Sequence, residues 1–136
     1  MLSIGQINND QDAPLVILKT ISTNDRTPAL SGIINDITAD VEVEVDNLTY
    51  TATVLSNGTW VVPNNTLLPL IDGYYDVMVT ATDSLLNANT ITVANAIFVD
   101  ATGPESFTNA ITTNDPTPAL SGTVSESLVA IEVSIG

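Results

Sequence analysis

The sequence predicts an all-β fold in which each unit is an antiparallel β-sandwich of about seven strands, repeated in tandem. Three observations predict this class. Val, Ile, Thr and Ala dominate a composition that is 44% hydrophobic but only 4% aromatic, and β-branched residues favour pleated sheets. Strand-like runs recur about every 8–12 residues, with turn residues between them. One stretch of sequence also returns 90 positions later.

The repeated stretch indicates the size of the unit. Residues 21–32 read ISTNDRTPALSG and residues 111–122 read ITTNDPTPALSG, so ten of the twelve positions are identical. A period near 90 residues is too long for one turn of a solenoid and suits a complete small β-sandwich. The chain is therefore expected to contain the closing strand of a preceding repeat at 1–10, a complete repeat at 11–100, and a linker with the opening strands of the next repeat at 101–136.

Within the complete repeat, alternation and turn signals place the strands. Val41 to Val45 alternates Val with Glu, which is typical of a strand with one buried and one solvent-facing side. Asp46-Asn47 and Asn57-Gly58 are hairpin-turn sequences. Trp60, the single tryptophan, is interpreted as a core anchor rather than a platform for a ligand. Strands are expected at residues 14–20, 29–34, 41–45, 49–55, 60–62, 75–81 and 91–99.

The composition disfavours several classes of function. Sixteen acidic residues against two basic ones, Lys19 and Arg26, give a net charge of −14, which repels nucleic acid and anionic membranes. The chain has no cysteine for disulfides or thiolate metal sites, and no histidine for the commonest acid–base and nucleophile systems. We therefore expect no catalytic residues and no enzymatic activity. The expected partner of so acidic a surface is a cation.

Hydropathy gives no sign of a membrane-inserted segment. The residues from Met1 to Gln6 lack the basic segment and apolar run of a signal peptide. Nowhere do about 18 apolar residues run together as they do in a membrane-spanning helix. We expect no membrane insertion, and the signal for any secretion is expected to lie outside this chain.

Strand direction predicts where acidic side chains gather. Successive strands of a sandwich alternate in direction, so alternate loops lie at the same pole of the unit. The pole at which the chain enters is expected to collect Asp10, Asp12, Asp36, Asp40, Asp83 and Asn87, and Asp100 and Glu126 hold the equivalent places in the next repeat.

Crowded carboxylates repel one another unless a cation lies between them. Calcium accepts about six to eight oxygen ligands in flexible geometry, whereas magnesium requires stricter octahedral order. We expect Ca²⁺ to bind at the junctions between repeats, through Asp10, Asp12, Asp36 and Asp83 on one side and Asp100 and Glu126 at the next junction. The alternative interpretation is that these residues are ordinary turn aspartates and solvated surface charge.

A second acidic pair belongs to the opposite pole. Asn24-Asp25 recurs as Asn114-Asp115 in the loop that follows the first strand. Asn and Asp commonly stabilise turns through side-chain to backbone hydrogen bonds. These residues are therefore expected to cap that turn, and a role in binding calcium at the junction is the other possibility.

Several motifs that follow one another along the chain resemble those of a known family. They are TNDxTPALSG, a hairpin ending in NGTW, the segment DGYYDVMVTATD, and a closing strand ending in VDATGP. Together they make the chain similar to the bacterial immunoglobulin-like repeats of giant surface adhesins. The resemblance implies an immunoglobulin-like sandwich in an extracellular extender module of biofilm and host-contact adhesins, with adjacent repeats as partners and calcium at the junctions.

The sequence is compatible with three functions. The first is a structural spacer that holds an adhesive domain away from the cell. The second is the subunit of an extracellular filament, in which neighbouring identical subunits exchange strands through unpaired edges. The third is a carbohydrate-binding module, which requires exposed aromatic residues that a chain with one Trp and three Tyr supplies poorly.

Overall fold

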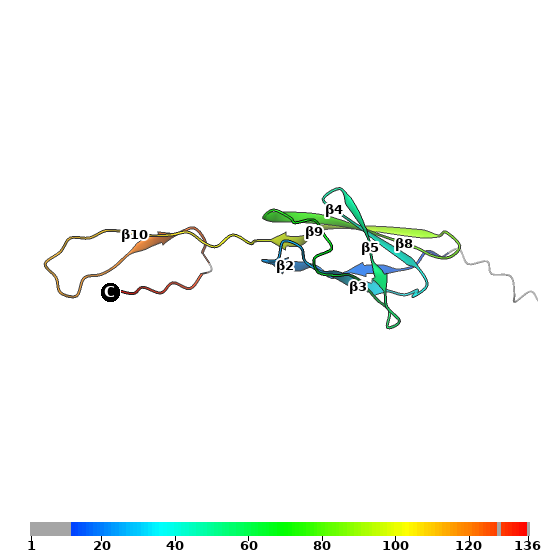
Figure 1. Ribbon diagram of the computed structural model, residues 1–136, viewed down its shortest axis with the longest axis horizontal. Coiled ribbons are helices and arrows are strands. Elements are labelled where there is room, and N and C mark those ends of the chain that lie inside the picture. The colour runs from blue at the N-terminus through cyan, green and yellow to red at the C-terminus, as the bar shows by residue number, and fades with distance from the viewer. Residues whose placement is uncertain (1–11, 128, 136) are drawn as a thin grey trace, which may run out of the picture. The chain divides into compact units, whose positions relative to one another are not determined.

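The computed structural model describes residues 12–127 and 129–135, and the chain divides into two compact units between Ala101 and Thr102 (Figure 1). Strands are the only long regular elements in this part of the chain. No helix of the described residues is long and apolar enough to cross a membrane. Asp10 and the predicted strand at 1–10 lie outside the described residues.

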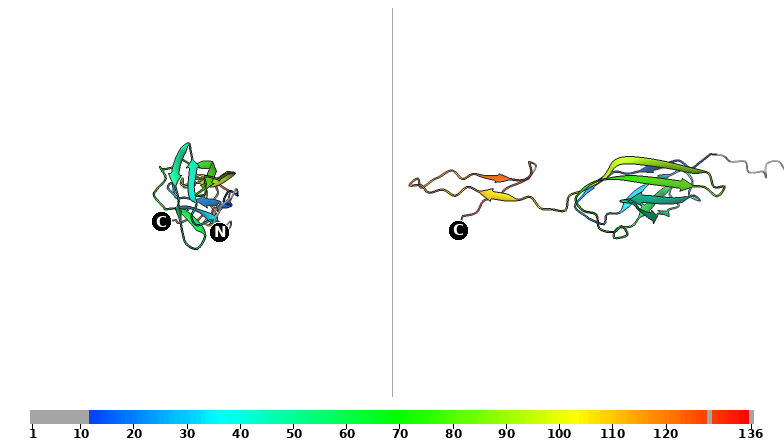
Figure 2. Two further views of the ribbon diagram at one scale, coloured as in Figure 1. Left: turned by 90° about the vertical axis from the view of Figure 1, so that its right-hand side faces the viewer. Right: turned by 90° about the horizontal axis from the view of Figure 1, so that it is seen from above.

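Residues 12–101 of the first unit contain nine strands in two sheets, seen as layers in Figure 2. Their bounds are β1 (Val16–Leu18), β2 (Ile21–Thr23), β3 (Leu30–Ile34), β4 (Asp40–Val45), β5 (Leu48–Thr51), β6 (Thr53–Val54), β7 (Thr59–Val62), β8 (Gly73–Thr82) and β9 (Ala88–Val99). One sheet has the order β1-β3-β7-β6, and the other has the order β2-β9-β8-β4-β5. The predicted all-β sandwich is confirmed.

The structure differs from the predicted strands at two places. The expected strand at 14–20 contains β1, and it is followed in the other sheet by β2, a strand that was not predicted. The expected strand at 49–55 divides between the sheets into β5 and β6. The sheet that contains β2 is not purely antiparallel as predicted, because β2 pairs with β9 in parallel. The chain keeps its direction as it passes from β1 to β2, and β9 runs the same way along the sandwich.

The core lies between the two sheets and follows the predicted alternation. In β4, Val41, Val43 and Val45 are buried, whereas Glu42 is exposed. Buried Val and Ala side chains alternate in the same way along the second half of β8. Such alternation buries one face of each strand and solvates the other.

Trp60 is the largest fully buried side chain, which confirms its expected role as a core anchor. Its partner across the sheet is Gly32 in β3. The indole ring lies against Gly32, and its Nε1–H donates a hydrogen bond of 3.1 Å to the carbonyl oxygen of Ile17 in β1. A Cβ atom on Gly32 would overlap that oxygen and would lie 2.6 Å from Cζ2 of the ring. The glycine is therefore required for this packing.

The hairpin turns have the backbone that their sequences predict. Asp46 and Asn47 have φ values of 51° and 65°, the left-handed conformation of a type I′ turn that joins β4 to β5. Gly58, with φ of 86°, supports the turn before β7.

In the second unit, the described residues form one antiparallel pair, β10 (Ser106–Thr108) with β11 (Gly122–Val124). Its register repeats that of β1 with β3, 90 positions later: Val16 pairs with Ile34, and Ser106 pairs with Val124. The flanking hydrogen bonds repeat as well. Lys19 N donates to Ser31 O, and Asn109 N donates to Ser121 O, each at 2.9 Å. The sequence repeat is thus accompanied by a repeat in strand pairing.

Candidate functional site

The entry pole of the first unit collects loops that are distant in sequence, as strand direction predicted. Asp40 pairs with Thr82, which brings the start of β4 to the end of β8. Asn89, near the start of β9, donates from Nδ2 to the carbonyl oxygen of Pro14 at 3.0 Å. The segments that precede β1, precede β4 and follow β8 therefore meet at one end of the sandwich. Asp12, Asp36 and Asp83 belong to these three segments.

Asp83 is the one buried charged residue among the described residues, and its carboxylate organises the loop between β8 and β9. Oδ1 accepts hydrogen bonds from the backbone N–H groups of Leu85 (2.9 Å) and Asn87 (2.8 Å). Oδ2 accepts a bond of 3.0 Å from Nδ2 of Asn87. The side-chain amide of Asn87, together with these backbone groups, lowers the pKa of Asp83 below its usual value, although burial acts in the opposite direction.

The lowered pKa predicts a loss of stability in acid. Because the folded state holds the Asp83 proton less tightly than the unfolded state, its stabilisation is complete above the unfolded pKa of about 3.9 and is lost as the pH falls through the folded value. We expect the thermal midpoint of the first unit to fall more steeply below about pH 4 in the natural chain than in Asp83→Asn. Equal slopes for the two proteins would contradict this role of the carboxylate.

Asp36 at the entry pole stabilises its own turn. Its Oδ1 accepts from the backbone N–H (2.9 Å) and the hydroxyl (2.6 Å) of Thr38. The same arrangement, an Asp or Asn whose Oδ1 accepts both groups of a threonine two positions later, recurs at other turns, and we call it the Asx-x-Thr turn. It is formed by Asp25 with Thr27, Asp36 with Thr38, Asn57 with Thr59, and Asp115 with Thr117. The expected capping role of Asp25 and Asp115 is confirmed.

We expect Asp25→Ala to lower the stability of the first unit by about 1 kcal/mol, since it removes both bonds to Thr27. This change corresponds to a thermal midpoint lower by about 4–8 °C. Asp25→Asn keeps an Oδ1 acceptor and should retain most of the stability. Midpoints measured by circular dichroism test this, and two variants of equal midpoint would contradict the hydrogen-bonding role.

The opposite end of the sandwich, where the chain leaves β9, is called the exit pole. It contains Asp72, an acidic residue that was not among the predicted site residues. Asp72 Oδ1 forms an ion pair with Nη1 of Arg26 at 3.1 Å and accepts a bond of 3.0 Å from the backbone N–H of Ala101. Arg26 also donates to the carbonyl oxygen of Leu70 at 3.0 Å. Nothing in the local sequence indicates that Asp72 lies next to the chain leaving β9, since the contact joins residues 29 positions apart.

The remaining predicted metal ligands are dispersed. Asp100 lies at the exit pole, where its backbone N–H donates to the carbonyl oxygen of Thr23 at 2.9 Å. Asn24 is exposed beside Asp25, and Glu126 follows β11 in the second unit. Within residues 12–127 and 129–135, no three acidic side chains form a group that could hold a metal ion. The calcium site, which also includes Asp10, stays a prediction.

The two sheets, with β1 in one, the following β2 in the other and a parallel β2–β9 pair, define an immunoglobulin-like β-sandwich. The poles of this sandwich carry carboxylates that stabilise loops. Comparison with protein families agrees with the fold: the model of the bacterial Ig-like domain matches residues 19–101, and the chain belongs to this family. No curated protein matches the chain.

Proposed function

We propose that this chain is a structural, non-catalytic segment of a bacterial cell-surface adhesin, in which tandem Ig-like repeats extend a distal domain away from the cell. Bacterial Ig-like domains are typically extracellular, which supports this location. The partners of each repeat are then its neighbours in the array. Trp60 is buried and cannot stack on a sugar, so a carbohydrate-binding role has little support.

The observation that carries the proposal is the position of the two ends of the first unit. The chain enters beside the start of β9, where Pro14 accepts a bond from Asn89, and leaves after Val99 at the other end of the same strand. A strand of this length spans about 35 Å. Units connected in this way add length end to end, as an extender requires.

The second part of the proposal is that calcium stiffens the junctions. Carboxylates lie at both poles, with Asp36 and Asp83 at the entry and Asp72 and Asp100 at the exit. In tandem repeats, the exit pole of one unit meets the entry pole of the next, and calcium is suited to oxygen ligands supplied by loops. The net charge of −14 favours cation binding in general.

A calcium titration of the thermal midpoint tests this part. We expect the midpoint of the natural chain to rise at millimolar calcium and the rise to be lost in Asp83→Ala. Glu42→Gln is the matched control, because it removes one charge from an exposed mid-strand position and should keep the rise. The absence of a rise in the natural chain, or an equal rise in Asp83→Ala, would contradict calcium binding at the entry pole.

A second candidate is a subunit that assembles into filaments by strand exchange. The observation in its favour is the hairpin of β10 and β11, which exposes Phe107 and Leu120. Size-exclusion chromatography over a range of concentrations separates the candidates. A monomer at every concentration supports the extender, and a concentration-dependent ladder supports the filament.

A further inference from the structure

The outward face of the sheet β1-β3-β7-β6 carries an exposed apolar stripe, and we call it the β1–β3 face. Ile17 in β1 and Ile33 in β3 are cross-strand partners and are 60% and 56% exposed. Leu55, which follows β6, extends this row, because its N–H donates to the carbonyl oxygen of Thr59, the partner of Ile33 in β7. Together with Val61, the three aliphatic side chains line a groove of about 570 Å³. The stripe therefore crosses the whole sheet.

The two outward faces of the sandwich differ in charge. The other sheet carries Asp40, Glu42 and Glu44 at the outward positions of β4. By contrast, none of the outward residues of β1, β3, β6 and β7, all of which the structure describes, is acidic. Lys19, one of the two basic residues of the chain, borders the groove. In a protein with a net charge of −14, two copies can approach through the β1–β3 face without bringing strand carboxylates together.

Charges of opposite sign lie at the two ends of this stripe. Alternation along the chain puts Leu15, Ile17 and Lys19 on the same outward side, with Lys19 toward the exit pole. Asp36 follows β3 at the entry pole, next to the pair of hydrogen bonds that Asn35 forms with Leu15. A twofold axis that runs across the strands, in the plane of the contact, would bring Lys19 of each copy near Asp36 of the other. Opposite charges would then meet twice, once at each edge of the buried stripe.

We propose that the β1–β3 face binds the same face of a second copy of this chain, in an antiparallel twofold dimer. Contact of the β1–β3 face with the acidic face of the other sheet is disfavoured, because it would bury carboxylates such as that of Glu42 under aliphatic side chains. Two apolar faces in contact instead remove both stripes from water. Lys19 keeps its charged head at the margin of the contact, while its aliphatic stem covers part of the stripe.

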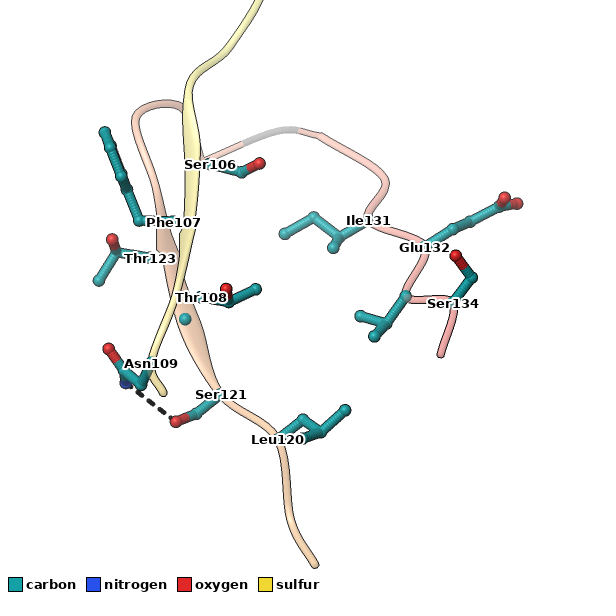
Figure 3. A pocket seen from close by; sticks show the side chains of 12 residues that line it. Ser106, Phe107, Thr108, Asn109, Leu120, Ser121, Thr123, Ile131, Glu132 and Ser134 are labelled. Carbon is teal, nitrogen blue, oxygen red and sulfur yellow. Dashed lines mark hydrogen bonds between the residues drawn. The ribbon is translucent and has the colours of Figure 1, made fainter. Parts of the chain in front are cut away.

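The second unit repeats one element of the β1–β3 face. Phe107, the counterpart of Ile17, is 62% exposed and points to the side of the hairpin opposite Ile131 (Figure 3). At the place that corresponds to Ile33, however, the second unit has Thr123. The substitution Ile33→Thr therefore introduces a residue that the same strand position already holds in the other unit, and it suits a test of the dimer.

A single contact of this kind is small. The four exposed aliphatic side chains of the face, Leu15, Ile17, Ile33 and Leu55, bury less than about 1,200 Å² in a dimer, the range of weak and transient interfaces. For one pair of units, we expect a dissociation constant on the order of 0.1 mM. Arrays that extend from two facing cells would form several antiparallel contacts at once, and these would strengthen one another. This lateral attachment of cells rests on the proposed function, whereas the dimer itself does not.

Sedimentation equilibrium of the natural chain, at concentrations on both sides of the expected dissociation constant, tests the dimer. Association should stop at two molecules, unlike the ladder expected of strand exchange. Ile33→Thr should weaken the dimer by about tenfold, because the substitution acts twice across the twofold axis. Met78→Thr is the matched control, since Met78 is an exposed apolar residue of β8 in the other sheet, and it should leave the dimer unchanged. A purely monomeric natural chain, or equal weakening by the two substitutions, would overturn the inference.

Cross-linking tests the direction of the two copies. The chain has no cysteine, so introduced thiols report on single positions. In the antiparallel dimer, Ser31 of one copy lies close to Leu15 of the other, so a mixture of Ser31→Cys and Leu15→Cys chains should give mixed dimers with a short bismaleimide. Self-linked Ser31→Cys dimers in preference to mixed ones would show parallel strands and overturn the arrangement. Neither experiment involves calcium or the junctions, so the dimer and the proposed function can fail separately.

Discussion

Trp60→Ala is expected to destabilise the first unit by about 3–5 kcal/mol, the largest effect of any single substitution that we predict. The ring fills the centre of the core between the sheets, and the variant would leave a cavity there. It would also leave Ile17 O without its indole donor. Because small domains are stable by only about 5–15 kcal/mol, a substantial fraction of the variant should be unfolded at moderate temperature.

Chemical denaturation followed by circular dichroism measures this effect, and two variants separate its causes. Trp60→Phe keeps much of the buried surface and removes the N–H donor, so it should cost less than Trp60→Ala. Tyr74→Ala removes an exposed aromatic ring that stacks on Phe98, and it should cost only about 1 kcal/mol. A loss in Trp60→Ala no larger than that in Tyr74→Ala would contradict the role of Trp60 as the core anchor.

Gly32→Ala is expected to be nearly as damaging, although it adds a single methyl group. That group would collide with Ile17 O and with the ring of Trp60, so either β1 must move away from β3 or the ring must leave its site. Overpacking of this kind, with loss of the indole hydrogen bond, should cost about 3 kcal/mol. The thermal midpoint should then fall by at least about 12 °C.

Fluorescence of Trp60, the single tryptophan, reports on the unfolding of the first unit in this variant. Gly103→Ala serves as the control, and its midpoint should stay within about 2 °C of the natural chain, because the added methyl group meets open space. A Gly32→Ala midpoint as high as that of the control would show that the glycine is not needed for the packing of the indole.

The parts of the fold that could be predicted from the sequence are those encoded by local patterns. The alternation of Val and Glu in β4 and the Asp46-Asn47 turn depend on neighbours along the chain, and the structure agrees with both. The passage of the chain from β1 in one sheet to β2 in the other depends on which sheet offers a partner at each point. The hydrophobicity of that segment does not carry this information, so the parallel pairing with β9 was missed.

In the candidate site, too, features set by nearby residues could be predicted from the sequence, and contacts between distant residues could not. Alternating strand direction was sufficient to place Asp36 and Asp83 at one pole. The hydrogen bonds of Asp36 with Thr38 could also have been expected from the spacing, since the pattern of Asp or Asn two residues before Thr recurs at the other Asx-x-Thr turns. The contact of Asp72 with Arg26 joins residues far apart in the chain and has no local signal.

Small-angle scattering from several tandem copies of residues 11–100 tests the central claim, that the repeats form an extended array whose junctions are stiffened by calcium. In calcium, we expect the maximum dimension to grow by about 35 Å with each added repeat. In chelator, the same chains should give a shorter maximum dimension, because the junctions bend while each sandwich stays folded. The same maximum dimension with calcium and with chelator would contradict the account.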